Sequence, residues 1–291
     1  MAWNSRKIPG YVKSLEFETS TGKIYKDHPA SSSSFSCQAC KIFDRFPSLF
    51  YVDSQMGYDY LLLQNGTLPL SPDGSFDAAV EHKCTAVLLW PENEPPTRDN
   101  TIAVDPCFTA QGFDYATAQL ERYRLSFRDI GWVFVTHYHR DHLPNVAQFT
   151  GYIKFRRFRP DAHPGFAGLT LVPQPGHAPD LRALVFVSPT AQKVYLVGDA
   201  ILNSNWLKAW GYYWPNGYTE ADIAQTWASV AAICAAADLI IPGHGQPIPV
   251  TAALVQELLT TFAQAKHANA CPHVEPLLRT RLAELERDDL T

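Results

Sequence analysis

Short apolar runs, each bounded by glycine, proline or polar residues, recur along this chain and predict its β-strands. They occupy residues 60–63, 85–90, 101–104, 131–135, 169–172, 183–187, 194–197 and 238–242. Stretches with apolar residues at helical spacing lie between or after them, at 113–125, 220–234 and 254–262. Thr219 and Asp222 match the polar pattern that begins a helix. Strands that alternate with helices indicate a layered α/β protein.

The strand predicted at 131–135 runs into a segment rich in metal-binding side chains. His137, His139, Asp141 and His142 lie within six residues, and each would be costly to bury without a partner. Imidazole and carboxylate groups are common ligands of catalytic zinc. His137 and His139 are two residues apart at a strand end, so their side chains leave on the same side. A polar turn with incidental histidines is the alternative, and the density of ligands argues against it.

Three later strands end in a similar way, each followed by a tight turn that contains glycine and then by a side chain able to bind a metal. These side chains are His177 after 169–172, Asp199 after 194–197 and His244 after 238–242. One such turn would be weak support, because single polar residues at strand ends are ordinary loop residues. Three in series predict one metal centre built from distant parts of the chain.

These residues, together with Asp105 at the end of the strand at 101–104, resemble the ordered motifs of the metallo-β-lactamase superfamily. The resemblance spans Asp105 to His244 and implies a four-layer αβ/βα sandwich in an α/β chain. It implies two metal ions, most simply two Zn²⁺, with iron or manganese as the other candidates. Carried over position by position, it implies a first metal site of His137, His139 and His177, a second site of Asp141, His142 and His244, a bridging Asp199, and a supporting Asp105 that binds no metal.

The same resemblance implies a dinuclear zinc hydrolase in which a metal-bridging hydroxide opens a small carbonyl substrate. Asp199 would position both ions, and Asp141 would orient the hydroxide and pass a proton to the leaving group. The intervals between the later ligands are similar to those of acyl-homoserine-lactone lactonases, although the interval from His142 to His177 is shorter. A lactone or other ester is therefore expected ahead of a thioester. The alternatives are a mononuclear iron dioxygenase acting on a sulfur substrate, a β-lactam hydrolase, and a metal-stabilised binding protein.

Composition narrows the class of protein. The chain has 291 residues and a net charge of −5, and without a long basic run it gives no sign of a nucleic-acid partner. We find no signal-peptide pattern and no run of about 20 apolar residues, which favours a cytoplasmic protein without a membrane partner. The six cysteines are too few for a disulfide scaffold. Cys37 and Cys40 form a single CxxC pair, which we interpret as two incidental thiols.

Two segments add expectations beyond the motif. We expect a single domain over residues 1–291, in which about residues 1–55 form an N-terminal extension that covers one face or contributes to a homo-oligomer interface. Six aromatic residues lie between Trp206 and Tyr218, just after Asp199. They suit either the lining of a small-molecule substrate pocket or packing against the sandwich, and Trp206, Trp210 and Tyr212 are the candidate substrate contacts.

Overall fold

Two five-stranded β-sheets form the centre of the protein, in a computed structural model that describes residues 56–145, 156–157 and 166–288. The first sheet has the order β1-β2-β3-β4-β5 and the second the order β10-β9-β8-β7-β6. Each sheet is mixed: β3, β4 and β5 run parallel, as do β8 and β9, while the other neighbours are antiparallel. The strands are β1 (Tyr58–Gln64), β2 (Ala86–Pro91), β3 (Ile102–Val104), β4 (Trp132–Phe134), β5 (Arg156–Arg157), β6 (Thr170–Pro173), β7 (Arg182–Val187), β8 (Lys193–Gly198), β9 (Leu239–Pro242) and β10 (Ile248–Pro249).

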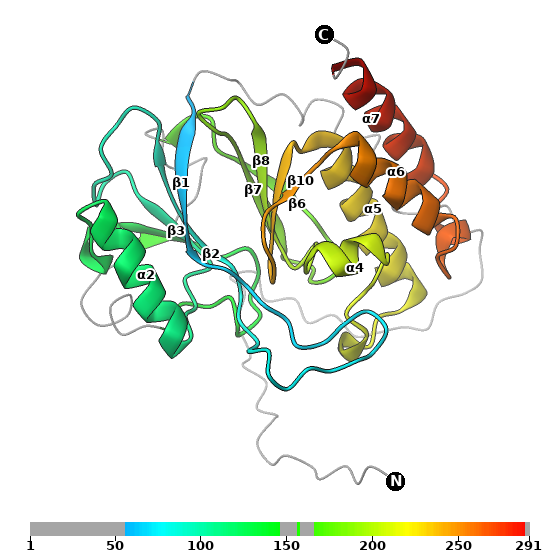
Figure 1. Cartoon of the computed structure of the whole chain (residues 1–291), viewed down its shortest axis with the longest axis horizontal. Helices are drawn as coiled ribbons and strands as arrows, with labels where there is room; N and C mark the ends of the chain where they lie inside the picture. The colour runs from blue at the N-terminus through cyan, green and yellow to red at the C-terminus, as the bar shows by residue number, and fades with distance from the viewer. Residues whose placement is uncertain (1–55, 146–155, 158–165, 289–291) are drawn as a thin grey trace, which may run out of the picture. The chain divides into compact units, whose positions relative to one another are not determined.

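Helices cover the outer face of each sheet (Figure 1). Helix α2 (Ala110–Arg122) packs on the first sheet, where Ala116 and Leu120 join a buried cluster with Leu88 and Trp90. Helices α5 (Glu220–Ala236), α6 (Ala252–Phe262) and α7 (Val274–Asp288) pack on the second sheet. Shorter helices are η1 (Phe127–Asp129), α4 (Ser204–Lys208), η4 (Trp214–Asn216) and η5 (Ala268–Ala270).

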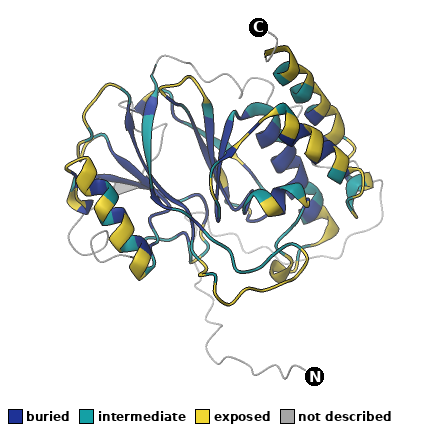
Figure 2. Cartoon of the chain, viewed as in Figure 1, coloured by how far each residue is buried: buried dark blue, intermediate teal, exposed yellow. Residues whose placement is uncertain are grey.

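A third buried cluster fills the space between the two sheets. Alternation along β2 sends Val87 and Leu89 into this cluster, whereas Leu88 faces α2. In β7, Leu184 and Phe186 point toward the first sheet. Buried residues accordingly concentrate on the strands and exposed ones on the outer helix faces (Figure 2). Helix, sheet, sheet and helix make four layers, which confirms the predicted αβ/βα sandwich.

The predicted strands all appear, shifted by one or two residues at their ends. Helix α5 begins as predicted, because Thr219 and Asp222 form a reciprocal capping box. Strands β5 and β10 and helices α4 and α7 were not predicted. The N-terminal extension, Cys37 and Cys40 lie outside the described residues, so these expectations remain predictions. Among the described helices, none combines the length and the apolar run that crossing a membrane requires.

The segment between β1 and β2 crosses from the first sheet to the second. The amide of Thr85 donates to the carbonyl of Gly243 at 2.6 Å, and the Trp206 indole donates to the carbonyl of Leu70 at 3.1 Å. These bonds attach the arm, residues 65–85, to the turn after β9 and to α4. The arm therefore borders the edge of both sheets at which the polar turns gather.

Candidate metal centre

Strand ends bring the predicted ligands together at one edge of the two sheets. His137 and His139 follow β4, His177 follows β6, Asp199 follows β8 and His244 follows β9. Their donor atoms form two groups, each with all atoms within 4.8 Å of one another. The groups are His137, His139, His177 and Asp199, and Asp141, His142, Asp199 and His244.

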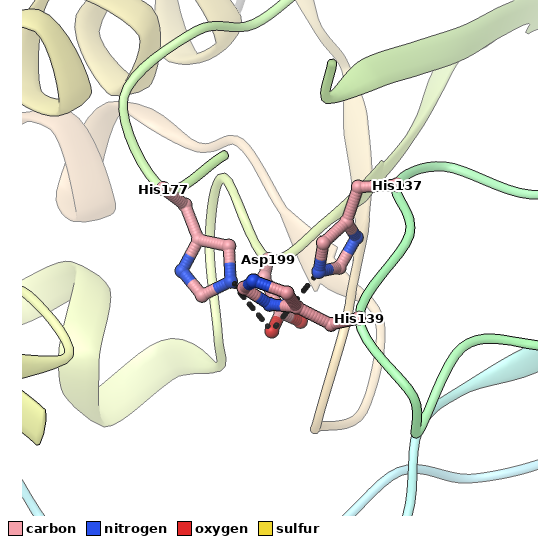
Figure 3. A group of neighbouring side chains, drawn as sticks. All are labelled: His137, His139, His177 and Asp199. Atoms are coloured by element: carbon pink, nitrogen blue, oxygen red, sulfur yellow. Dashed lines mark hydrogen bonds and ion pairs between the residues drawn. The ribbon is translucent and has the colours of Figure 1, made fainter. Parts of the chain in front are cut away.

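Asp199 belongs to both groups, and its two oxygens face different ones. Its Oδ2 lies 3.2 Å from Nε2 of His177 and 3.8 Å from Nε2 of His137. Its Oδ1 lies 3.1 Å from Nε2 of His142 and 3.2 Å from Nε2 of His244. In Figure 3 the three imidazoles of the first group surround the Asp199 carboxylate, with His137 and His139 on one loop and His177 on another. This is the arrangement expected of a carboxylate that bridges two ions.

The spacing and the state of the donor atoms fit metal ions. Ligand atoms about 2.1 Å from a tetrahedral metal lie about 3.4 Å apart, close to the separations at Asp199. Nε2 of His137, Nε2 of His142 and Oδ1 of Asp199 are buried and form no hydrogen bond. Buried polar atoms are nearly always paired. An ion at each group would satisfy these atoms, so the residues present fit two metals.

The electrostatics of the first group favour neutral imidazoles. Burial lowers the pKa of His137 to about 2 and that of His177 to about 4. Burial would raise the pKa of Asp199, but His244, His142 and His177 hold it well below its usual range. At neutral pH His137 and His177 thus present lone pairs on nitrogen and Asp199 an ionised carboxylate, the forms that bind metal.

In the second group, nearby carboxylates have a larger effect on the pKa values of the histidines. Burial would lower the pKa of His142 and of His244, but the Asp199 carboxylate raises both, with Asp105 adding to the rise at His142 and the Lys83 carbonyl at His244. Burial would raise the pKa of Asp141, and a hydrogen bond from His82 together with the charge of His142 lowers it instead. A cation bound here would replace the protons that the carboxylates otherwise attract.

Comparison with known proteins agrees with this geometry. No family model matches the chain. A curated relative, metallo-beta-lactamase domain-containing protein 1 of Xenopus laevis, is 29% identical over 153 residues, or 47% of this chain. The chain covers 63% of that relative's length. The four layers and the order of the His and Asp residues agree with the domain type that the relative's name gives. This chain has the metallo-β-lactamase fold.

Solved structures of the metallo-β-lactamase fold follow a similar but distant chain path. A metallo-beta-lactamase family protein of Thermus thermophilus is 17% identical, with a TM-score of 0.45 over 72% of this chain and 79% of that one. An N-acyl homoserine lactone hydrolase, with its product bound at the catalytic metal centre, is 13% identical, with a TM-score of 0.44 over 66% and 94% of the respective chains. The His and Asp cluster of this chain could hold metal ions.

Asp105 supports the ligand loop of this metallo-β-lactamase fold. Its Oδ1 accepts from the Thr136 amide at 2.8 Å, and its Oδ2 accepts from the Thr136 hydroxyl at 2.7 Å and from Nδ1 of His142 at 2.8 Å. A carboxylate only accepts, so the proton of neutral His142 sits on Nδ1 and Nε2 is free for a metal. Asp105 itself lies in neither donor group.

Other supports were not anticipated from the sequence. The Tyr218 hydroxyl lies 2.8 Å from Nδ1 of His177, and Nδ1 of His244 lies 2.9 Å from the carbonyl of Lys83. His82 places Nε2 3.1 Å from Oδ2 of Asp141 and packs its ring on His244. Tyr218 and Lys83 contact His177 and His244 at Nδ1, which leaves Nε2 of each ring to face Asp199, and His82 contacts Asp141 directly. They join residues far apart in sequence, so spacing along the chain carried no signal for them.

Two glycines keep the turns close to the Asp199 carboxylate, which both donor groups share. Gly198 has a φ of +51°, and a Cβ there would overlap the Thr136 hydroxyl. A Cβ on Gly243 would overlap Oδ1 of Asp199. The Gly-Asp and Gly-His turns noted in the sequence thus have a steric reason.

The aromatic segment after Asp199 packs more deeply than a pocket lining requires. Trp206 and Trp210 are each 3% exposed, and the Trp210 indole donates to the carbonyl of Leu258 at 3.0 Å. Both tryptophans and Tyr212 border a cavity beside His177 and Asp199, but its volume of about 20 Å³ admits roughly one water. The geometry favours packing for Trp206 and Trp210, and substrate contact by these residues remains a prediction.

Tyr213 is a tyrosine of this segment whose pKa responds to the charges of both acidic ligands, whereas that of Tyr218 responds to Asp199. Burial raises the pKa of Tyr213, and the charges of Asp141 and Asp199 raise it further. Tyr212 instead contacts the rings of Tyr218 and His267, at 6.2 Å and 6.0 Å between centroids. A phenol that stays protonated can donate a hydrogen bond, and Tyr213 and Tyr212 both border the cavity beside His177 and Asp199. Substrate contact by Tyr212 remains a prediction.

Proposed function

We propose that this protein is a dinuclear metal hydrolase, with zinc as the metal and a small lactone or other ester as the substrate, ahead of a thioester. The observation that carries the proposal is the split of the Asp199 carboxylate, whose Oδ2 faces His137 and His177 and whose Oδ1 faces His142 and His244. A mononuclear enzyme has no need of a second complete group. Imidazole and carboxylate donors without a thiolate suit zinc, although they also accept iron or manganese.

The first group would be held by His137, His139 and His177, and the second by Asp141, His142 and His244, with Asp199 shared. When bound, two divalent metals supply a water of lowered pKa and a Lewis acid for a carbonyl oxygen. The protein supplies fixed positions for that chemistry. Asp105 holds His142, and Tyr218 holds His177, so neither imidazole must reorganise during a reaction.

Asp141 is the exposed carboxylate of the centre, and this exposure suits proton transfer. Its side chain is 32% exposed, whereas that of Asp199 is 5% exposed. Its Oδ2 is 3.1 Å from His82 and 3.4 Å from His244, so one oxygen is held while the carboxylate remains open to a substrate. Its lowered pKa keeps Asp141 ionised, the form that accepts hydrogen bonds from a water or a substrate group.

Tyr213 would donate a hydrogen bond to the oxygen that gains negative charge when the carbonyl is attacked. Such a donor is worth about 2–4 kcal/mol when it is well aligned. Tyr213→Phe is expected to lower kcat by about a hundredfold with little change in KM. Tyr212→Phe is the matched control, because Tyr212 differs by one residue and turns toward Tyr218 and His267, and it should retain kcat.

One experiment tests the proposal as a whole: metal quantification on the purified protein, with a panel of lactone, ester, thioester, β-lactam and phosphodiester substrates. We expect about two zinc ions per chain and turnover of lactones or esters. One tightly held iron without a second metal would refute the dinuclear proposal. Turnover confined to β-lactams or phosphodiesters would refute the substrate class.

A further inference from the structure

A second, larger cavity opens on the Asp141 side of the metal centre, away from the aromatic segment. Its volume is about 560 Å³, and its lining includes His82, Lys83, Cys107, Arg140, Asp141 and Asn145. Pockets for small molecules are typically about 300–1,000 Å³. A molecule in this cavity would therefore have room for several atoms beyond the group held at the metals.

The cavity wall is cationic in a protein with a net charge of −5. Lys83 and Arg140 line it, and among the residues that the structure describes no ion pair is recorded for either side chain. Burial raises the pKa of the Cys107 thiol, the charges of Asp141 and Asp105 raise it further, and the charges of His142 and Arg140 oppose the rise. Both acidic and basic groups therefore act inside the cavity. The carboxylate in the lining, Asp141, already belongs to the second ligand group.

The backbone at Lys83 and at Arg140 is held beside the metal centre. Lys83 exchanges two backbone hydrogen bonds with Thr67, at 2.8 Å and 3.0 Å, and its carbonyl lies 2.9 Å from Nδ1 of His244. Arg140 lies between the ligands His139 and Asp141, in a turn closed by the amide of His142 on the carbonyl of His139 at 3.1 Å. Neither backbone position can shift without moving a ligand.

The opposite wall is also held in place. Asn145 accepts from the Phe108 amide at 2.9 Å and donates to the Phe108 carbonyl at 2.8 Å. This pair joins the start of α2 to the end of the ligand loop. The cavity is therefore built before a ligand arrives, which limits the entropy lost on binding.

We propose that this cavity is a subsite for a carboxylate group of the substrate, bound by Arg140 and Lys83. The substrate class becomes a lactone, ester or thioester that carries a free acid a few bonds from the scissile carbonyl. The inference rests on the proposed function, because it places that carbonyl at the two ligand groups. A guanidinium presents parallel donors that match the two oxygens of a carboxylate, and an ammonium adds a point charge.

A matched pair of esters tests the subsite: the monophenyl ester of glutaric acid and phenyl pentanoate, which has a methyl group in place of the acid. We expect the wild-type protein to favour the charged ester in kcat/KM by about tenfold, or about 1.4 kcal/mol. The double variant Lys83→Gln, Arg140→Gln should lose this preference through a higher KM for the charged ester, so that the ratio of kcat/KM between the two esters falls to about one. Lys266→Gln, which lines a different groove, is the control and should keep it. A preference that survives in the double variant would overturn the subsite.

Glutarate binding to the metal-loaded protein, measured by calorimetry at low salt, gives a second result that needs no turnover. We expect the double variant to bind glutarate about tenfold more weakly than wild type at an unchanged melting temperature and metal content. Equal binding would show that the metals alone hold the acid and would overturn the proposal. Tighter binding of inorganic phosphate with the same residue dependence would overturn the carboxylate assignment. Retained glutarate binding without hydrolysis of any ester would refute the proposed function and leave the subsite standing.

Discussion

Replacing Asp105 with Asn is a sharp perturbation of the ligand loop, because it changes one charge and almost no volume. Asp105 is 2% exposed and has a φ of +45°, a conformation that Asn tolerates and Ala does not. The Asn amide can still accept from Thr136 through its oxygen. Its NH₂ group replaces Oδ2, which accepts from the Thr136 hydroxyl and from Nδ1 of His142.

The substitution should reverse the tautomer of His142. An NH₂ group can only donate, so Nδ1 of His142 would become an acceptor and the proton would move to Nε2. That atom lies 3.1 Å from Oδ1 of Asp199, where the second metal is expected to bind. Loss of a support of this kind typically weakens metal affinity by about 10–100-fold. Two charge-assisted hydrogen bonds of about 1.5–3 kcal/mol each are altered, so we expect unfolding to be easier by about 3 kcal/mol.

Titration of the metal-free protein with zinc, against a competing chelator, would measure the two dissociation constants separately. Only the zinc affinity of the second group should fall. Urea unfolding of the metal-free protein should give the loss in the free energy of unfolding. Asp114→Asn, on the exposed face of α2, removes the same charge elsewhere and should leave both quantities unaltered. Unchanged zinc affinity in Asp105→Asn would show that Asp105 does not set the tautomer of His142.

Three further predictions follow from single side chains. Asp199→Ala should leave less than one retained metal per chain because both groups share this carboxylate, and full retention in metal analysis would refute the bridge. Trp210→Ala should lower the free energy of unfolding by about 3–5 kcal/mol without changing KM, and a raised KM at unchanged stability would instead place Trp210 in the substrate pocket. The Thr219 hydroxyl and amide lower the pKa of Asp222, so its capping contribution is present above a pH of about 3.8 and is lost as the pH falls through its lowered pKa. Asp222→Ala should accordingly cost about 0.5 kcal/mol at pH 7 after allowance for solvent exposure, and urea unfolding should show that difference vanish in acid.

The ligands could be predicted from the sequence because they stand at strand ends, where an apolar run changes abruptly to imidazole or carboxylate. His177, Asp199 and His244 each follow such a change. The same periodicity predicts the strands that carry them, since a buried strand and a polar turn differ strongly in composition. Local sequence was sufficient here because each ligand and its strand are neighbours in the chain.

Helix α7 was not predicted for a related reason. Its sequence is dominated by charged residues, and only Val274 and Leu278 are buried, so the apolar face is narrow. Pro276 falls in its first turn, a position where proline is compatible with a helix, yet proline in the interior of a pattern usually indicates a break. Helix α7 is stabilised by its packing against α5 and α6, which its own sequence pattern does not indicate.

The supporting residues could not be predicted from local sequence, because each reaches its ligand only through a tertiary contact. Tyr218 reaches His177 over 41 residues, and Asp105 reaches His142 over 37. Asp105 and His142 follow the neighbouring strands β3 and β4, and Tyr218 precedes α5, which packs on the sheet that carries His177, so both contacts form only when these elements assemble. Tyrosine is also an ordinary packing residue, so its type alone does not distinguish Tyr218 from Tyr212, and only the fold separates the aromatic side chain that holds a ligand from those that fill the core.

The two ligand groups differ in how the fold prepares them. In the first group, burial among other imidazoles makes neutral histidines, with the pKa of His137 at about 2. In the second, carboxylates raise the pKa of His142 and His244, so a cation there must displace protons. Asp199 belongs to both groups, and Asp105 contacts His142 directly and reaches His137 through the Thr136 hydroxyl. The arm at 65–85 adds its support to the second group, through the Lys83 carbonyl beside His244. The second group is also the one that adjoins the cavity lined by Lys83 and Arg140.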